Sequence, residues 1–280
     1  MTRTYYAPAK INLWLRVFAP DATGYHPLDT LFCAIDLQDE LQIGPGDGLD
    51  LFVTGADVGP VEQNLAYRAA LEYCHAIGVA PNVAIQLHKN IPAGAGLGGG
   101  SSDAAAVLRA LQDLHGQALP QADLIALAAR LGSDVPFFLC GSSWAQASGR
   151  GEILQPLSPL PSRPVLIVVP EFPIATRDAY RWLDESGMLA EPRGLITLSR
   201  SWQDVENNAI NTFEEVLFQR FPELAGLRDA LDASGAAISM VSGSGSALFA
   251  TFVSDDAART ARQNLAAHAP VKTCLARTLE

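Results

Sequence analysis

The stretch IPAGAGLGGGSSDAAA, residues 91–106, is the most informative part of this 280-residue sequence. Five of the seven residues from Gly94 to Gly100 are glycine, and two serines and an aspartate follow before an alanine-rich helical run. Glycine loses more backbone freedom on folding than any other residue, so such a cluster needs a reason. The loop is either a flexible surface segment or a main chain that must lie close against a ligand.

The context of the loop favours a ligand. A strand pattern covers residues 82–89, and a helix is expected to begin near Ser101–Asp103. In a strand, loop and helix arrangement, the loop N–H groups and the positive end of the helix dipole together bind anions such as phosphate. We therefore expect nucleotide binding rather than a purely structural loop.

Two common phosphate motifs do not fit. Residues 94–99 match GxGxxG, but a dinucleotide-binding fold would continue into a strand ending in an acidic residue, and here a turn and another helix follow. A P-loop requires Gly-Lys followed by Ser or Thr, and no lysine follows these glycines. The loop belongs to neither class.

Composition narrows the classes of function. The chain carries 19 Lys and Arg against 30 Asp and Glu, a formal charge of −11, which argues against non-specific nucleic-acid binding. The four cysteines form no CxxC pair and the five histidines show no metal-ligand spacing, so no structural zinc is expected. With no signal-peptide or membrane-span pattern, we expect a soluble cytoplasmic protein. Its oligomeric state stays open.

Periodicity indicates a mixed α+β protein. Strand patterns occupy residues 6–17, 31–37, 39–44, 82–89, 136–141, 142–148, 164–170, 237–241 and 247–253, and helical patterns occupy residues 64–78, 103–116, 121–132, 202–221, 223–234 and 257–268. Residues 154–164 contain four prolines and are typical of an interdomain linker. We predict two domains, residues 1–158 and 159–280.

Two polar residues are ambiguous by themselves. Strand alternation places Lys10 on the face opposite Ile11 and Leu13, where a lone lysine is usually solvated. Asp134, in LGSDVPFF, is ordinary turn chemistry after a helix.

Together with the loop, these residues resemble a known family. The segments PAKINLWL, GYHPLDT, NLAYRAA, IPAGAGLGGGSSDAAA, LGSDVPFFLCG and VSGSGSALFATF occur in the order and spacing of the GHMP small-molecule kinases. The resemblance implies an N-terminal domain like the second domain of ribosomal protein S5 and a ferredoxin-like C-terminal domain, with the active site between them. It also implies ATP with Mg²⁺ as the phosphoryl donor.

The resemblance assigns roles residue by residue. Asp134 would be the general base for the acceptor hydroxyl, and Lys10 would hold that aspartate ionised and steady the transferring phosphoryl. The ATP-binding residues would be Asn64, Leu65 and Lys89 near the adenosine and Pro92, Ala93, Gly94, Ala95, Gly96, Leu97, Gly98, Gly99, Gly100, Ser101, Ser102 and Asp103 around the phosphates. Ser102 and Asp103 are also weak candidates for contact with Mg²⁺, and no dedicated metal site is expected.

The acceptor side rests on an aromatic pair. Tyr25 and His26 match positions where members of the family bind a cytosine ring, and Asn12, Thr176 and Tyr180 match further substrate contacts. The implied substrate is a small molecule carrying a cytidine diphosphate group, on the non-mevalonate route to isoprenoids. Many relatives place a basic residue and Asp-Gly before Tyr-His, whereas this chain has no Lys or Arg between Arg16 and Gly24.

Alternatives remain at this stage. The acceptor could be homoserine, mevalonate or a sugar, or the chain could be a catalytically silent binding protein on this fold. An ATP-dependent decarboxylase is more remote, because its substrate lacks a nucleobase and would not need Tyr25 and His26.

Overall fold

The computed structural model describes residues 1–191, 196, 201–268 and 271–280. The chain forms two compact units, each assembled from separate segments. Unit 1 comprises Met1–Ala9, Leu37–Ala93 and Gly98–Ser142, and unit 2 comprises Lys10–Asp36, Gly94–Leu97 and Ser143–Glu280.

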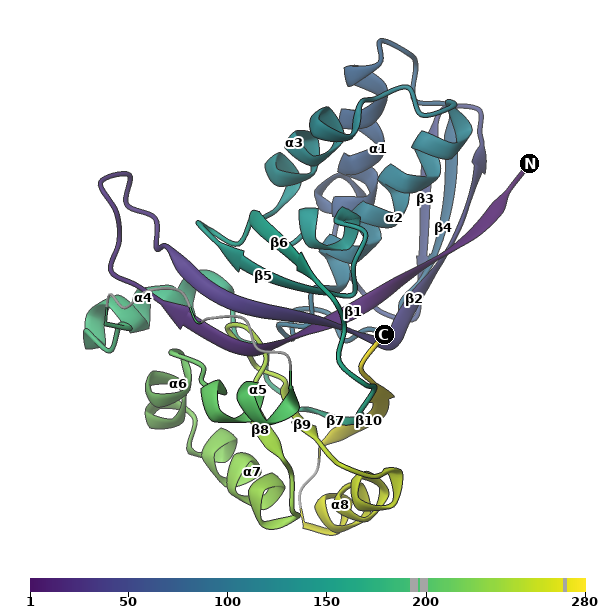
Figure 1. Ribbon diagram of the computed structural model, residues 1–280. Coiled ribbons are helices and arrows are strands. Elements are labelled where there is room, and N and C mark those ends of the chain that lie inside the picture. The colour runs from purple at the N-terminus through teal and green to yellow at the C-terminus, as the bar shows by residue number, and fades with distance from the viewer. Residues whose placement is uncertain (192–195, 197–200, 269–270) are drawn as a thin grey trace. The chain divides into compact units, whose positions relative to one another are not determined.

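Unit 1 contains three neighbouring strands covered by helices. Its strand order is β3-β4-β2, built from β3 (Leu49–Thr54), β4 (Val83–His88) and the second part of β2 (Leu28–Pro45). Residues 40–45 of β2 run antiparallel to β4, and β3 runs parallel to β4. Around them lie η1 (Val61–Gln63), α1 (Leu65–Ala76), α2 (Gly99–Leu114), α3 (Gln121–Leu131) and η2 (Pro136–Leu139) (Figure 1).

Small side chains let α1 and α2 approach closely. The buried face of α1 includes Ala66, Ala69 and Ala70, and α2 buries a long alanine-rich stretch. One polar link crosses this interface, since the Tyr73 hydroxyl donates to Gln112 Oε1 at 2.6 Å. Satisfying these buried polar groups fixes how the two helices are aligned.

Unit 2 contains two strand groups. In the first, residues 30–33 of β2 pair with β5 (Trp144–Ser148), which pairs with β6 (Ile153–Leu157). The second sheet has the order β10-β7-β9-β8, all antiparallel, built from β7 (Pro164–Val169), β8 (Ile238–Val241), β9 (Leu248–Thr251) and β10 (Lys272–Arg277). With one helical connection between β7 and β8 and another between β9 and β10, this is the ferredoxin-like βαββαβ arrangement.

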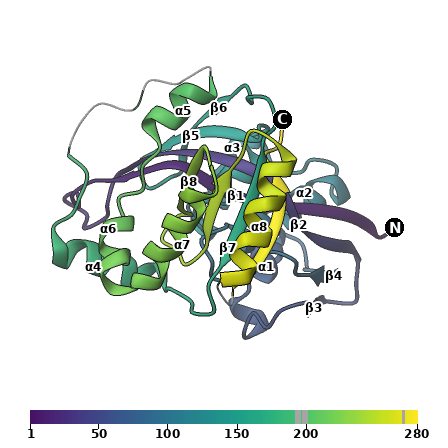
Figure 2. The ribbon, with the colours of Figure 1, turned by 90° about the horizontal axis from the view of Figure 1, so that it is seen from below.

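Helices cover one face of this second sheet. Figure 2 shows α7 (Pro222–Ala233) and α8 (Asp255–His268) lying across the strands, with α4 (Thr176–Ser186), α5 (Trp202–Asn208) and α6 (Glu214–Arg220) beside them. The core between helices and sheet includes Leu166, Val168, Leu227 and Leu265. The predicted α+β class and ferredoxin-like domain are therefore confirmed.

One predicted strand is wrong. Residues 136–141 were expected to be extended because of their apolar run, but Pro136–Leu139 form a 3-10 helix. Phe138 N donates to the Val135 carbonyl, a short-range bond that a strand would not make. Proline suits the first turn of a helix because its N–H is not needed there.

One predicted helix is also wrong in part. Residues 202–221 form two helices, α5 and α6, with Ala209 in an extended conformation between them. The Ile210 carbonyl accepts from Leu15 N at 2.7 Å, and Thr212 N donates to the Leu15 carbonyl at 2.9 Å. These bonds to β1 (Arg3–Val17) outweigh the helical pattern of the sequence.

Other elements went unpredicted. Strands β3 and β10, helix α4 and strand β6 have no counterpart in the sequence prediction, and β6 takes up the first residues of the expected linker. Segments 31–37 and 39–44 form one continuous strand, β2.

Every residue of β1 from Ala9 to Val17 is buried, so the solvated alternative for Lys10 is wrong. No helix in the described part of the chain is long and apolar enough to cross a membrane.

Candidate functional site

The glycine-rich loop adopts backbone conformations that require glycine. Gly94, Gly96 and Gly98 have φ values of 67°, 78° and 71°. A Cβ on Gly96 would lie 2.1 Å from the Ser242 carbonyl oxygen, whereas one on Gly94 would meet nothing within 4 Å. Gly96 therefore serves close packing as well as turn geometry, and Gly94 serves the turn alone.

Within unit 2 the loop is held by the segment VSGSGS, residues 241–246. Ser242 Oγ donates to the Gly96 carbonyl at 3.0 Å, and Ala247 N donates to the Ala95 carbonyl at 3.2 Å. The buried Asn211 amide donates at 2.8 Å to the carbonyls of Val241 and Gly243 and thereby fixes this segment. Sequence reasoning missed Asn211, which falls inside the helix wrongly predicted for residues 202–221.

The start of α2 offers uncapped hydrogen-bond donors. Gly98 is its N-cap residue, so no side chain caps the helix, and its first turn contains no acidic residue. Ser102 is fully buried, and its Oγ has no hydrogen-bond partner among the described residues. Free N–H groups at a positive helix end, with a buried unpaired hydroxyl beside them, suit an anionic ligand.

A buried ionic cluster lies behind this helix start in unit 1. Lys89 Nζ donates to Asp39 and, at 2.6 Å, to Asp103 Oδ2. Asp39 Oδ1 accepts from the backbone N of Asn90 at 2.6 Å and of Ile91 at 2.8 Å. One ammonium thus joins the end of β4 to β2 and to α2, and Asp39 was not among the predicted site residues.

One carboxyl group of this cluster, that of Asp103, has a raised pKa. Burial, together with the neighbouring Asp39 carboxylate, raises the pKa of Asp103 to about 7 despite the opposing effect of Lys89. Asp103 Oδ1 has no hydrogen-bond partner among the described residues. The cluster therefore holds one carboxyl group that titrates near neutral pH.

Lys10 is oriented by its neighbours in unit 2. Its Nζ donates to Asn12 Oδ1 at 2.8 Å and to the Gly96 carbonyl at 3.0 Å. Asn12 Nδ2 donates in turn to Thr30 Oγ1 at 2.8 Å. The structure therefore brings together three predicted site residues: Lys10, Asn12 and Gly96.

The remaining ATP-side residues lie in unit 1. Asn64 is the N-cap of α1, where its Oδ1 accepts from Ala66 N at 2.9 Å. Leu65 follows it, and a Cβ on Gly100 would lie 3.7 Å from Leu65 Cδ1. Asp134 lies half-buried in the turn between α3 and η2. Its pairing with Lys10 stays a prediction.

The predicted acceptor residues form an aromatic corner in unit 2. The rings of His26 and Tyr180 lie 5.3 Å apart at 43°. Tyr25 is 54% exposed, and Thr176 Oγ1 accepts from Ser244 Oγ at 3.0 Å. Segments far apart in the sequence therefore meet at this corner.

His26 is already engaged on both ring nitrogens. Its Nδ1 lies 2.7 Å from the Phe18 carbonyl oxygen and its Nε2 lies 3.1 Å from Asp184 Oδ1. A carbonyl oxygen only accepts, so Nδ1 carries a hydrogen in this geometry. The ring therefore contributes a fixed surface, and a bound base that used its nitrogens would have to replace one of these contacts.

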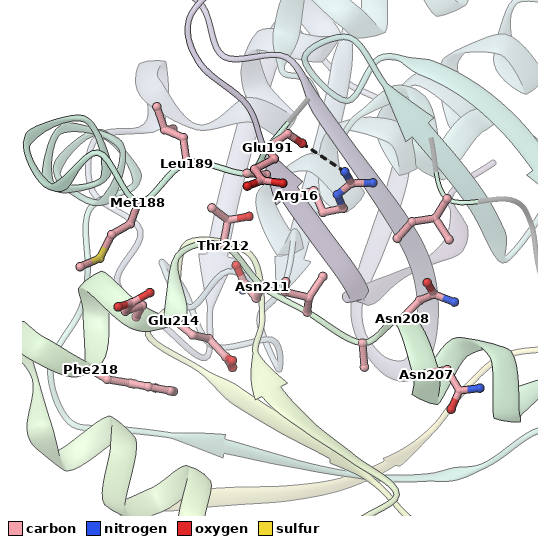
Figure 3. Close-up of a pocket in the computed structure, with 15 residues that line it drawn as sticks. Arg16, Met188, Leu189, Glu191, Asn207, Asn208, Asn211, Thr212, Glu214 and Phe218 are labelled. Carbon is pink, nitrogen blue, oxygen red and sulfur yellow. Dashed lines mark hydrogen bonds between the residues drawn. The ribbon is translucent and has the colours of Figure 1, made fainter. Parts of the chain in front are cut away.

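A separate cavity of about 950 Å³ lies elsewhere in unit 2 (Figure 3). Arg16 and Glu191 lie on one side, where an Arg16 Nη2 atom donates to the Glu191 carbonyl at 3.4 Å, and Glu214 and Phe218 lie on another. None of the predicted site residues lines it. Residues 192–195 and 197–200 fall outside the described part of the chain, so we assign no ligand to this cavity.

Among the residues that the structure describes, no group of three or more His, Cys, Asp and Glu side chains could hold a metal ion.

Comparison with known proteins places these features in one family. The sequence pattern of the GHMP kinases N terminal domain matches residues 64–142, and that of the GHMP kinases C terminal domain matches residues 197–271. The chain is 41% identical over 250 residues to the 4-diphosphocytidyl-2-C-methyl-D-erythritol kinase of Deinococcus radiodurans, covering 88% of this chain and 82% of that protein. It is 37% identical over 270 residues to the enzyme of the same name from Syntrophomonas wolfei, covering 92% of each.

Comparison with solved structures agrees. A crystal structure of 4-(cytidine 5'-diphospho)-2C-methyl-D-erythritol kinase superposes with a TM-score of 0.84 at 38% identity, covering 99% of this chain and 100% of the other. The identities exceed 30% over most of the chain, and both domain patterns are present. The chain belongs to the GHMP kinase family.

Proposed function

We propose that this chain is an ATP-dependent kinase that phosphorylates the 2-hydroxyl of 4-diphosphocytidyl-2-C-methyl-D-erythritol, yielding ADP and the 2-phosphate. The relatives above carry the name of this activity. The observation that carries the proposal is the contact between His26 and Tyr180. An aromatic corner beside an exposed Tyr25 suits a nucleobase, which homoserine, mevalonate and sugars lack.

The loop is suited to the donor's phosphates. The loop from Pro92 to Ser102 supplies the backbone N–H groups of its non-proline residues, and Lys10 adds a cation that already contacts the Gly96 carbonyl. Phosphoryl transfer asks a protein mainly to position the reactants and to stabilise charge on the equatorial oxygens. Asn64, Leu65 and Lys89 are proposed to lie near the adenosine.

The reaction needs one proton acceptor. The substrate hydroxyl oxygen forms a bond to the γ-phosphorus, the bond from that phosphorus to the β–γ bridging oxygen breaks, and ADP leaves. Asp134 takes the hydroxyl proton and passes it to solvent, while Asn12 orients the acceptor and Lys10 steadies the transferring group. Positioning and charge stabilisation, rather than covalent catalysis, would supply most of the rate.

Mg²⁺ fits the oxygen atoms present at the helix start. Ser102 Oγ and Asp103 Oδ1 are buried and have no hydrogen-bond partner among the described residues. Two protein oxygens are enough, because Mg²⁺ usually keeps several waters and binds substrate phosphates. When bound, it would neutralise charge on the donor phosphates.

The surroundings of the protein are part of the proposal. We expect a small-molecule enzyme of the cytoplasm that does not bind membranes. The formal charge of −11 argues further against binding to nucleic acid. The functional domains are proposed to comprise residues 1–158 and 159–280.

Phosphorus NMR tests the function directly. The protein is incubated with Mg-ATP and 4-diphosphocytidyl-2-C-methyl-D-erythritol, and in parallel with homoserine, mevalonate or galactose. We expect a new phosphomonoester resonance only with the cytidine compound, and a loss of at least about 100-fold in rate for Asp134→Asn, within the range that general-base catalysis contributes.

Asp123→Asn is the matched control, since Asp123 lies exposed in the first turn of α3. It should keep the wild-type rate. A resonance with homoserine, mevalonate or galactose alone would contradict the proposed identity of the acceptor. The absence of a resonance with every alcohol would favour the alternative of a catalytically silent binding protein.

A further inference from the structure

The acceptor corner holds a cation that the local sequence lacks. No Lys or Arg occurs between Arg16 and Gly24. In the structure, however, the Arg150 guanidinium lies over the Tyr25 ring, with its Cζ 3.5 Å from the ring centroid. Arg150 comes from the turn between β5 and β6, so a distant segment brings positive charge to Tyr25.

The turn that carries Arg150 is tightly held. Gly149 and Gly151 flank it with φ values of 69° and 108°, and Arg150 N donates to Glu152 Oε2 at 2.6 Å. The Gly149 carbonyl accepts from Leu28 N at 2.8 Å, which ties the turn to the residues just after Tyr25 and His26. Arg150 is therefore anchored beside this corner through its backbone.

The Arg150 side chain still has donors to offer. A guanidinium carries five N–H groups. Among the described residues it makes one hydrogen bond, from Nη2 to Thr23 Oγ1 at 3.3 Å. Asp21 lies nearby, and Arg150 contributes, after the hydrogen bonds from Thr23 and Tyr25, to holding the pKa of Asp21 below its usual value. No carboxylate of the described residues forms an ion pair with Arg150.

Other arginines over aromatic rings differ in this respect. In the described residues, Arg16, Arg163, Arg181 and Arg220 also lie over rings, and each pairs with a carboxylate. Arg220, for example, lies 4.8 Å from the Trp182 ring centroid and 3.1 Å from Glu185 Oε2. Arg150 is the one of these five arginines that forms no ion pair with a carboxylate of the described residues, and it lies at an exposed position.

We propose that Arg150 is a substrate-binding residue that holds the Tyr25 ring in place and donates hydrogen bonds to the diphosphate of the acceptor. Its planar fork matches two phosphate oxygens at once. Tyr25 keeps 54% of its surface exposed, which leaves area for the base. The inference rests on the proposed function and identifies Arg150 as the cation that a distant segment brings to Tyr25.

The test compares Arg150→Gln and Arg150→Lys with Arg220→Gln, a matched loss of an arginine that lies over a ring but is already paired. KM for the acceptor, KM for ATP and kcat are measured for each variant. Binding of cytidine diphosphate and of cytidine is measured by calorimetry with saturating ADP, so that the donor site is filled.

Arg150→Gln should raise KM for the acceptor and Kd for cytidine diphosphate about tenfold, as expected for a lost charge-assisted contact. Cytidine should weaken only about twofold, because it has no phosphate and loses only the support that Arg150 gives to Tyr25. KM for ATP and kcat should stay unchanged. Arg150→Lys should recover part of the affinity, and Arg220→Gln should match the wild type throughout.

Two results separate the inference from the proposed function. If wild type phosphorylates the cytidine substrate while Arg150→Gln keeps its KM for the acceptor, the role of Arg150 is overturned and the function stands. If wild type phosphorylates no such substrate, both fall. An equal loss of affinity for cytidine and cytidine diphosphate would overturn the diphosphate contact. A wild-type thermal midpoint verifies that each variant is folded.

Discussion

The ionic cluster of unit 1 and the aromatic corner of unit 2 differ in where their charges lie: the charges of the cluster are buried and paired, whereas the cation of the corner is exposed. Lys89, Asp39 and Asp103 are almost wholly excluded from solvent, and every contact described for them is within unit 1. Tyr25 and Arg150 are exposed, and the guanidinium has hydrogen-bond donors to spare. A buried charge is costly unless paired, whereas an exposed one costs little to leave open for a ligand.

We therefore expect the cluster residues to hold the candidate site together, and we propose that Tyr25 and Arg150 select the substrate. The buried cluster links β2, the residue after β4 and α2, so changes there should act on the stability of unit 1 and on the glycine-rich loop. Tyr25 and Arg150, the exposed residues of the corner, contribute little to the core, so changes to them should act on the affinity for the acceptor. Three substitutions test this division, in order of decreasing effect on stability.

Lys89→Met should have the largest effect. It leaves two carboxylates buried without their cation, and breaking a buried pair costs about 3–5 kcal/mol of unfolding free energy. Urea unfolding at pH 8 measures the loss. The double variant Lys89→Met with Asp103→Asn should recover part of it, because a neutral amide replaces a buried carboxyl group that would otherwise have to take up a proton at this pH. A loss below about 1 kcal/mol, the size expected of an exposed pair, would contradict the statement that the buried cluster stabilises unit 1.

Asp103→Asn should change how stability depends on pH. The pKa of Asp103 is raised to about 7 in the folded protein, above its ordinary value of 3.8, so the folded state holds this proton more tightly. The group's contribution is therefore full at low pH and is lost as pH rises from about 4 through 7. Between pH 5 and pH 8, the free energy of unfolding of the variant should therefore rise by about 2 kcal/mol relative to that of the wild type.

Unfolding in magnesium-free buffer at several pH values measures this difference. Asp123→Asn, on the exposed first turn of α3, provides the control with no such pH dependence. A constant difference between Asp103→Asn and wild type across this range would show that Asp103 is ionised throughout it.

Tyr25→Leu should have the smallest effect on stability. The ring is 54% exposed, so the unfolding free energy should change by no more than about 0.5 kcal/mol. KM for the acceptor should nevertheless rise about tenfold, because base stacking on an aromatic ring is worth about 1–3 kcal/mol. Steady-state kinetics and thermal unfolding together check both statements. An unchanged KM with reduced stability would reverse the division between the two regions.

Sequence reasoning succeeded where the signal was local. The glycine loop was identified because positive φ angles and close packing demand glycine at positions such as Gly96. Helix α3 was predicted at its observed start, since its apolar spacing follows the helical period. The family was recognised from short motifs whose order survives in the chain, and the comparisons confirm it.

It failed where distant hydrogen bonds overrode local preference. The run from Trp202 to Phe221 has a helical pattern, but pairing with Leu15 holds its middle extended. A second error has a local cause instead: the apolar residues 136–139 have the composition of a strand, but short-range hydrogen bonds and Pro136 at the first turn make a 3-10 helix. The sequence predicts Lys89 near a ligand, and no sequence pattern indicates that Asp39 pairs with Lys89.

The sequence by itself determined the family, the α+β class, the glycine-rich loop and the pair Tyr25–His26, because each depends on short motifs or on local periodicity. Only the tertiary structure decided that Lys89 is enclosed by Asp39 and Asp103, that Tyr180 meets His26, and that Arg150 lies on Tyr25. Such contacts form only when folding brings distant segments together, and their burial then sets how strongly each charge interacts.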